Sequence, residues 1–180
     1  MVPSSISVSG GFCVLLALML LLVPFPWLFA AVVAAGFHEL CHYAAIRLCV
    51  GARCRPAFFA FSARLPLPPM SRGREMICAL AGPAGGLCLL LLGGWMPRLA
   101  LCAAMQSIYN LLPIYPLDGG RALRSAVLLV MKPTSAALLC GLLSVLCKLF
   151  LCLLGFYACF WLKLGIFPLL MTALLLIRVK

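Results

Sequence analysis

Long apolar runs are the feature that most constrains how this chain can fold. Several runs approach 20 residues with few or no charges, and a run of about 20 apolar residues spans the hydrocarbon core of a bilayer as a helix. Of the 180 residues, 66% are hydrophobic, and the mean hydropathy is +1.22. Because that composition is too apolar for a soluble domain, we expect an all-α, polytopic membrane protein with about six transmembrane helices.

Prolines and charged residues divide the apolar runs into segments. The string Pro24-Phe25-Pro26 permits only a tight reversal, and its second proline suits the first turn of a helix. Residues 50–75 mix arginines, phenylalanines and prolines, which predicts a short hairpin at the membrane surface between the second and third helices. The expected spans are residues 8–23, 27–48, 76–96, 98–113, 135–156 and 158–178.

The chain is predicted to form one transmembrane domain over residues 1–180, with a core at 27–132 and a C-terminal helix pair at 133–180. No basic residue precedes the first apolar run and no convincing small-x-small cleavage site follows it, so we expect this run to be retained as the first span. The eleven cysteines lie mostly inside apolar runs, where they act as small hydrophobes. Although Cys49 and Cys54 could pair in a loop, we expect no disulfide framework.

The basic residues report on topology. The formal net charge is +11, yet Lys and Arg lie at the ends of apolar runs and form no single basic face, so we expect no nucleic-acid partner. With six spans, Arg47, the arginines of 50–75, Arg121 and Lys180 fall on one side, and Arg98 falls on the other. The positive-inside rule then places both termini in the cytoplasm.

Both histidines of the chain lie in one string, His38-Glu39-Leu40-Cys41-His42, within an apolar run. Residues four apart share one face of a helix, so the two imidazoles can hold one metal ion while Glu39 faces its open coordination position. Since His and acidic residues are so rare here, a random His-Glu-x-x-His is roughly a one-in-thousands event. His38 precedes Arg47 by nine residues, which puts the metal roughly 10–15 Å below the cytoplasmic surface.

Two imidazoles leave zinc short of its usual protein ligands, and Asp118 is the candidate for the third. A carboxylate normally survives in a membrane only when it is paired or bound to metal, and Asp118 is the one acidic residue after Glu75. Glu75 itself is expected to pair with a nearby arginine or to cap the third span. Prolines and the pair Gly119-Gly120 predict irregular backbone where Asp118 sits, which membrane proteins tolerate only against protein or a water-filled cavity.

These residues support peptide-bond hydrolysis at one zinc ion per chain. Zinc lowers the pKa of bound water from about 15.7 towards 7, and Glu39 can take the proton and later deliver it to the leaving amine. Asn110 stands two helical turns before Asp118 and can donate a hydrogen bond to a developing oxyanion. Asn110 could equally anchor an extended substrate, or bind a carbonyl freed near Pro113.

Two strings together, Phe37 to His42 and Asn110 to Arg121, resemble the paired signature of the site-2 protease family of intramembrane zinc metalloproteases. The second string matches the family's Asn-x-x-Pro and Leu-Asp-Gly elements, and Ala81-Gly82-Pro83 is similar to its Gly-Pro element. The resemblance covers most of residues 27–132. It implies zinc ligands at His38, His42 and Asp118, a catalytic acid/base at Glu39, and a substrate or oxyanion contact at Asn110.

Small size and six spans most resemble the family's subgroup of sporulation proteases, which includes stage IV sporulation protein FB. This likeness implies a bacterial cell membrane, a membrane-tethered precursor such as a sigma factor as substrate, and regulatory membrane partners. We expect no PDZ or cystathionine-synthase-type domain. Two positions depart from the family pattern: Cys41, interpreted here as a packing residue, replaces a frequent Gly, and Ala84 follows Gly-Pro without the frequent polar residue. Gly82, Gly85 and Gly86 are expected to pack helices closely.

Other interpretations use the same residues. A metal transporter would need further polar residues aligned across the membrane, and few exist beyond Lys148 and Lys163. A catalytically inactive scaffold is the third function. In the plainest case, the two histidines hydrogen-bond between helices and Asp118-Gly119-Gly120 is a turn. The complete set of residues favours the peptidase.

Overall fold

The computed structural model describes residues 23–51 and 70–161, and every regular element within those residues is helical. The elements in chain order are α2 (Phe25–Val50), α3 (Arg72–Cys88), the short 3-10 helix η1 (Leu89–Leu92), α4 (Pro97–Asn110), α5 (Asp118–Val130) and α6 (Pro133–Phe160). The all-α prediction is therefore confirmed for this part of the chain.

Three of the described helical stretches are long and apolar enough to cross a membrane: Phe25–Cys49, Arg72–Leu92 and Pro133–Phe160. They correspond to the spans expected at 27–48, 76–96 and 135–156, and they indicate a membrane protein. As predicted, Pro26 lies in the first turn of α2. In the first turn of α3, Arg72 Nη1 donates a hydrogen bond to Glu75 Oε2 at 3.1 Å, the arginine pairing expected of that glutamate.

The other expected spans are not confirmed. The helix predicted at 98–113 ends early, since α4 has 14 residues, about 21 Å of helix against a hydrocarbon core of about 30 Å. Pro113 accounts for the early end, because proline disfavours helical backbone at the preceding residue and supplies no N–H. The spans at 8–23 and 158–178, and the hairpin at 50–75, lie largely outside the described residues.

Helix α5 was not predicted, and it corrects the expectation at Asp118. The irregular backbone covers residues 111–117, and Asp118 is the first residue of a helix. The two glycines do not break this helix. They belong to its first turn because the preceding loop folds directly against it: a Cβ at Gly119 would overlap the Leu111 carbonyl, and one at Gly120 would overlap the Ile114 backbone.

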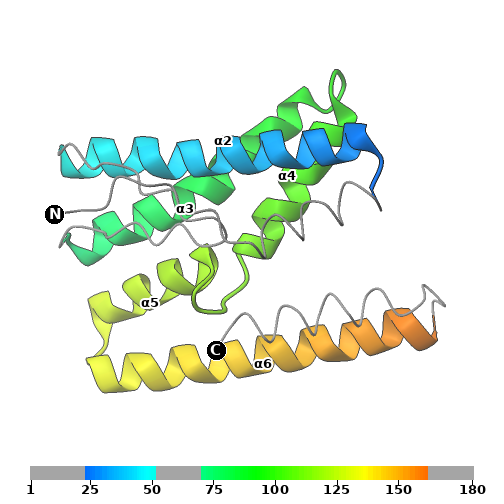
Figure 1. The fold of residues 1–180 in the computed structure, drawn as a ribbon. Helices are drawn as coiled ribbons and strands as arrows, with labels where there is room; N and C mark the ends of the chain where they lie inside the picture. The colour runs from blue at the N-terminus through cyan, green and yellow to red at the C-terminus, as the bar shows by residue number, and fades with distance from the viewer. Residues whose placement is uncertain (1–22, 52–69, 162–180) are drawn as a thin grey trace, which may run out of the picture.

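The helices pack side by side around the middle of α3. Helices α2 and α3 run in opposite directions, α4 crosses them, and α5 lies against α3 (Figure 1). Helix α6 packs along α5 and exposes most of its large apolar side chains, including Leu138, Phe150 and Phe160. Exposed apolar surface on this scale suits a lipid environment rather than water.

Small side chains dominate the buried core, and they let the helices approach closely. Cys78 and eight alanines are buried, whereas Ile46 and Ile114 are the only large aliphatic side chains in the described core. A Cβ at Gly85 would overlap the Cys41 thiol, and one at Gly86 would overlap the Ser107 hydroxyl. The predicted roles of these glycines and of Cys41 in helix packing are thus confirmed.

Candidate metal centre

Helix α2 carries both histidines on the face that it buries. His38 is 3% exposed and His42 is 7% exposed, one turn apart in the middle of the helix. The intervening residues Glu39 and Leu40 are exposed. A helix with this spacing therefore presents two imidazoles to the protein interior from one rigid element.

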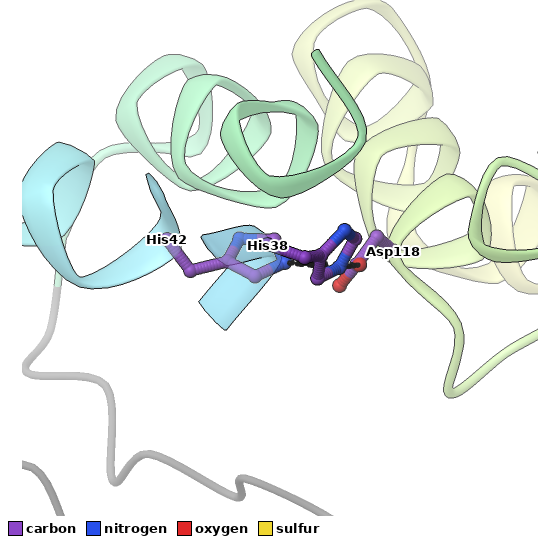
Figure 2. A group of neighbouring side chains, drawn as sticks. All are labelled: His38, His42 and Asp118. Atoms are coloured by element: carbon purple, nitrogen blue, oxygen red, sulfur yellow. Dashed lines mark hydrogen bonds and ion pairs between the residues drawn. The ribbon is translucent and has the colours of Figure 1, made fainter. Parts of the chain in front are cut away.

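Asp118 meets the two histidines from the start of α5. Its Oδ2 atom lies 3.1 Å from His38 Nε2 and 3.0 Å from His42 Nε2, and the two Nε2 atoms are 3.2 Å apart. Figure 2 shows the three side chains pointing toward one another, two from α2 and one from the first turn of α5. The structure thus brings together the three residues predicted as metal ligands, and they form a buried group able to hold a metal ion.

The position of the ring hydrogen on neutral His42 shows why a cation suits the group of His38, His42 and Asp118. Its Nδ1 atom donates a hydrogen bond to the Cys78 carbonyl oxygen at 2.7 Å. In the neutral ring the Nε2 atom then carries a lone pair, which faces His38 Nε2 and the Asp118 carboxylate. Electron pairs crowded together in a buried space repel one another unless a proton or a metal ion lies among them.

The spacing of these atoms also fits a metal. Bonds of about 2.0–2.1 Å to a tetrahedral zinc ion separate its ligand atoms by about 3.3 Å. The observed separations of 3.0–3.2 Å form a triangle only slightly smaller than one face of that tetrahedron. Three protein ligands would leave the fourth position open, the arrangement typical of catalytic rather than structural zinc.

Two contacts around the site, made by the Cys78 carbonyl and by Arg121, could not be predicted from the sequence. The Cys78 carbonyl orients His42 as groups behind metal ligands commonly do, but a main-chain atom cannot be identified from residue type. Arg121 Nη1 lies 3.8 Å from Asp118 Oδ1, whereas Oδ2 is the oxygen that contacts both histidines. In the sequence, Arg121 marks topology and ends the second string, and its i, i+3 relation to Asp118 becomes apparent only once α5 is known.

Gly82 has a more specific role than the packing expected of it. A Cβ at this position would overlap the His42 ring at Nε2, the atom that faces Asp118. The absence of a side chain on α3 thus makes room for the imidazole in its ligating orientation. By contrast, His38 Nδ1 is buried without a hydrogen-bond partner among the described residues.

The two predicted catalytic residues lie outside this cluster. Glu39 is exposed on α2 beside His38 and makes no hydrogen bond or ion pair within the described ranges. Asn110 is half-buried at the end of α4. The prediction that Asn110 stands two helical turns before Asp118 is wrong, because the loop at 111–117 separates them.

Comparisons with protein-family models, curated proteins and solved structures find no significant match to this chain. The likeness to the site-2 protease family therefore depends on the two sequence strings. What the structure adds is independent of that likeness, since it brings the three expected ligands together across the fold.

Proposed function

We propose that this chain is an intramembrane zinc endopeptidase that hydrolyses a peptide bond in or near the transmembrane segment of a membrane-tethered protein. The observation that carries the proposal is the convergence of two imidazole nitrogens and one carboxylate oxygen, 3.0–3.2 Å apart, among apolar helices. Zinc is the metal proposed because two imidazoles and a carboxylate are a ligand set that zinc peptidases use.

Each residue of the site has a distinct task in this reaction. His38, His42 and Asp118 would hold the zinc ion, which acts as a Lewis acid and makes water nucleophilic near neutral pH. The Glu39 carboxylate is exposed beside His38 and has no cationic partner in the described part of the chain, so it is free to accept a proton from water. It then returns that proton to the leaving amine.

Substrate binding falls to Asn110 and the loop that follows it. The amide of Asn110 ends α4, where regular helix gives way to the irregular backbone of residues 111–117. An amide at such a position can donate to a substrate carbonyl and can stabilise an oxyanion that develops on it. The substrate segment must be locally unwound to reach this loop, since a helical peptide bond has its carbonyl already paired.

The substrate class and the side of action follow from resemblance and charge. By likeness to the site-2 protease family, the substrate is a membrane-tethered transcription-factor or sigma-factor precursor in a bacterial cell membrane. Arg47 at the end of α2, Arg72 at the start of α3 and Lys132 before α6 lie at one end of the helices, whereas Arg98 lies at the other (Figure 1). The positive-inside rule supports a cytoplasmic location for the first end.

The two rival functions have less support. A metal transporter would carry its ion through a series of sites, but the described residues hold one group of His, Cys, Asp or Glu able to bind a metal. An inactive scaffold has no use for three buried ligands, because burying polar groups costs free energy that packing alone would not require.

Co-expression with candidate membrane-tethered transcription-factor precursors from the same genome tests the proposal. Glu39→Gln should retain zinc in the purified protein and cleave at least about 100-fold more slowly, the contribution typical of a general acid/base. Asp118→Ala should lose both zinc and cleavage. Glu75→Gln is the matched control, since Glu75 pairs with Arg72 away from the ligands, and it should retain both.

Undiminished cleavage by Glu39→Gln would rule out the assigned mechanism. Uptake of zinc into proteoliposomes that Glu39→Gln leaves intact would instead favour the transporter.

A further inference from the structure

We propose that Arg121 is a positioning residue of the metal centre. By holding Oδ1 of Asp118, it makes the carboxylate bind the ion through Oδ2 alone and keeps the fourth coordination position open. The proposed reaction assigns no task to this arginine. Its role rests on the metal centre of the proposed function, but it does not depend on peptide hydrolysis.

The two oxygens of the Asp118 carboxylate face different partners. Oδ2 lies 3.1 Å from His38 Nε2 and 3.0 Å from His42 Nε2. Oδ1 instead lies 3.8 Å from Arg121 Nη1, one helical turn further along α5. Within residues 23–51 and 70–161, Oδ1 accepts no hydrogen bond, so this ion pair is the contact that holds the second oxygen.

The carboxylate needs such a contact because its orientation is otherwise soft. The backbone at Asp118 is fixed, since Gly119 and Gly120 lie directly against the preceding loop. The χ2 torsion of an aspartate, however, has only a broad preference, so its two oxygens can swing relative to the histidines. Carboxylates bind metal ions through one oxygen or through both. A cation that attracts one of the two oxygens therefore decides between these modes.

The surroundings of Arg121 make it effective in this role. Its side chain is 25% exposed and that of Asp118 is 13% exposed, whereas Arg72, in the i, i+3 pair with Glu75 on α3, is 54% exposed. Exposed ion pairs are weakened by water and salt, and partly buried pairs are weakened less. A guanidinium also stays charged and has no lone pair, so Arg121 cannot itself bind the ion.

The number of oxygens that Asp118 supplies decides what else can bind. Two imidazoles and one oxygen make three protein ligands, which leaves a fourth position for water as in catalytic zinc sites. Two imidazoles and both oxygens would surround the ion with four protein atoms. Partners of ligating side chains typically change metal affinity or activity by about 10–100-fold, which is the scale expected for Arg121.

The test uses the purified full-length chain in detergent, loaded with excess Co²⁺ in place of zinc. Visible absorption by Co²⁺ is strong with four ligands and weaker with five. The original chain should give the four-coordinate spectrum. Arg121→Met removes the charge at similar length, and it should lower the absorption per bound ion by at least about 2-fold as the second oxygen joins the ion. Arg121→Lys keeps a cation one turn from Asp118 and should restore the original spectrum.

Arg124→Met is the matched control. Arg124 is the next arginine on α5, and its guanidinium lies 5.8 Å from the centroid of the Tyr115 ring rather than against Asp118. This variant should give the original spectrum.

Three results would overturn the role of Arg121 while leaving the metal centre in place. They are an unchanged spectrum in Arg121→Met, an Arg121→Lys spectrum that matches that of Arg121→Met, and a five-coordinate spectrum in the original chain. The last can be read even if Arg121→Met does not fold. A folded chain that binds neither Co²⁺ nor zinc would instead refute the metal centre, and with it both the proposed function and this role.

Discussion

His42 is the most constrained side chain of the metal centre. The Cys78 carbonyl fixes its Nδ1 atom, Gly82 leaves room for its ring, and its Nε2 atom lies 3.0 Å from Asp118 Oδ2. The ring is therefore oriented by the neighbouring helices before any ion binds. Such preorganisation reduces the entropic cost of coordination.

Gly82→Ala should weaken zinc binding by at least about 10-fold, the range seen when the support of a metal ligand is lost. The added methyl group would overlap the His42 ring and force it away from Asp118. Helix α3 itself should persist, because alanine is a better helix former than glycine. Zinc content after dialysis against a chelator, together with helicity from circular dichroism, would check both expectations.

The matched control is Gly73→Ala on the same helix, where an added Cβ meets nothing within 4 Å. This variant should bind zinc like the original chain. Equal zinc content in the two variants would show that the space at Gly82 has no part in holding His42.

For single residues, the three metal ligands can be predicted from the sequence, whereas the groups that surround and orient them cannot. His38, His42 and Asp118 are predictable because rare ionisable groups in an apolar chain need a reason to be there. The Cys78 carbonyl and the space at Gly82 are not, since both depend on the register between α2 and α3. The exposure of Glu39 is also hard to predict, because it depends on which face of α2 is buried. Glu39 follows the buried His38 by one residue and so lies off that face.

Among the elements, the junction between α4 and α5 has the greatest effect on the site, because it delivers Asp118. The loop backbone at residues 111–115 lies against the first turn of α5, and Ile114 is fully buried there. Asp118 consequently sits at a helix start, where the positive end of the helix dipole favours a carboxylate.

Gly119→Ala should lower the stability of the fold by about 1–3 kcal/mol, the usual cost of overpacking a tight contact. The new methyl group would overlap the Leu111 carbonyl, and neither backbone can move without shifting Asp118. Chemical unfolding in detergent would measure the change. As a control, Gly141→Ala meets nothing within 4 Å on α6 and should be neutral or slightly stabilising; equal stabilities would refute the role of this contact.

The length of each apolar run decides whether its helix can be predicted from the sequence. Helices α2, α3 and α6 are predictable because a long apolar run inside a membrane must pair its own backbone hydrogen bonds, which a helix does within one segment. Helix α5 was missed because Asp118-Gly119-Gly120 has the composition of a turn, and only contact with the loop explains glycines in a helix. Helix α4 was extended too far across Pro113.

For the whole molecule, the arrangement of charge predicts its orientation. The first turn of α4 carries Arg98, whose guanidinium lies over the Trp27 ring. Arg47 at the end of α2, Arg72 at the start of α3 and Lys132 before α6 mark the opposite end of the helices, as the course of the helices in Figure 1 shows. An arginine stacked on a tryptophan is a typical membrane-interface contact.

Reporter domains inserted into the full chain would test this orientation. Alkaline phosphatase should be active only when inserted after Gly94, and a fluorescent protein should fluoresce only when inserted after Lys132, because the first folds outside the cytoplasm and the second inside. The reverse pattern would place the Arg47 end of the helices outside the cell and contradict the proposed side of action.

The sharpest check of the metal centre is X-ray absorption at the zinc K edge of the purified, zinc-loaded chain. We predict a first shell of nitrogen and oxygen only, at about 2.0–2.1 Å, with the scattering pattern of two imidazoles. A shell containing sulfur at about 2.3 Å would contradict it. That result would assign the metal to cysteines such as Cys41 and would remove the ligand set on which the proposed peptidase depends.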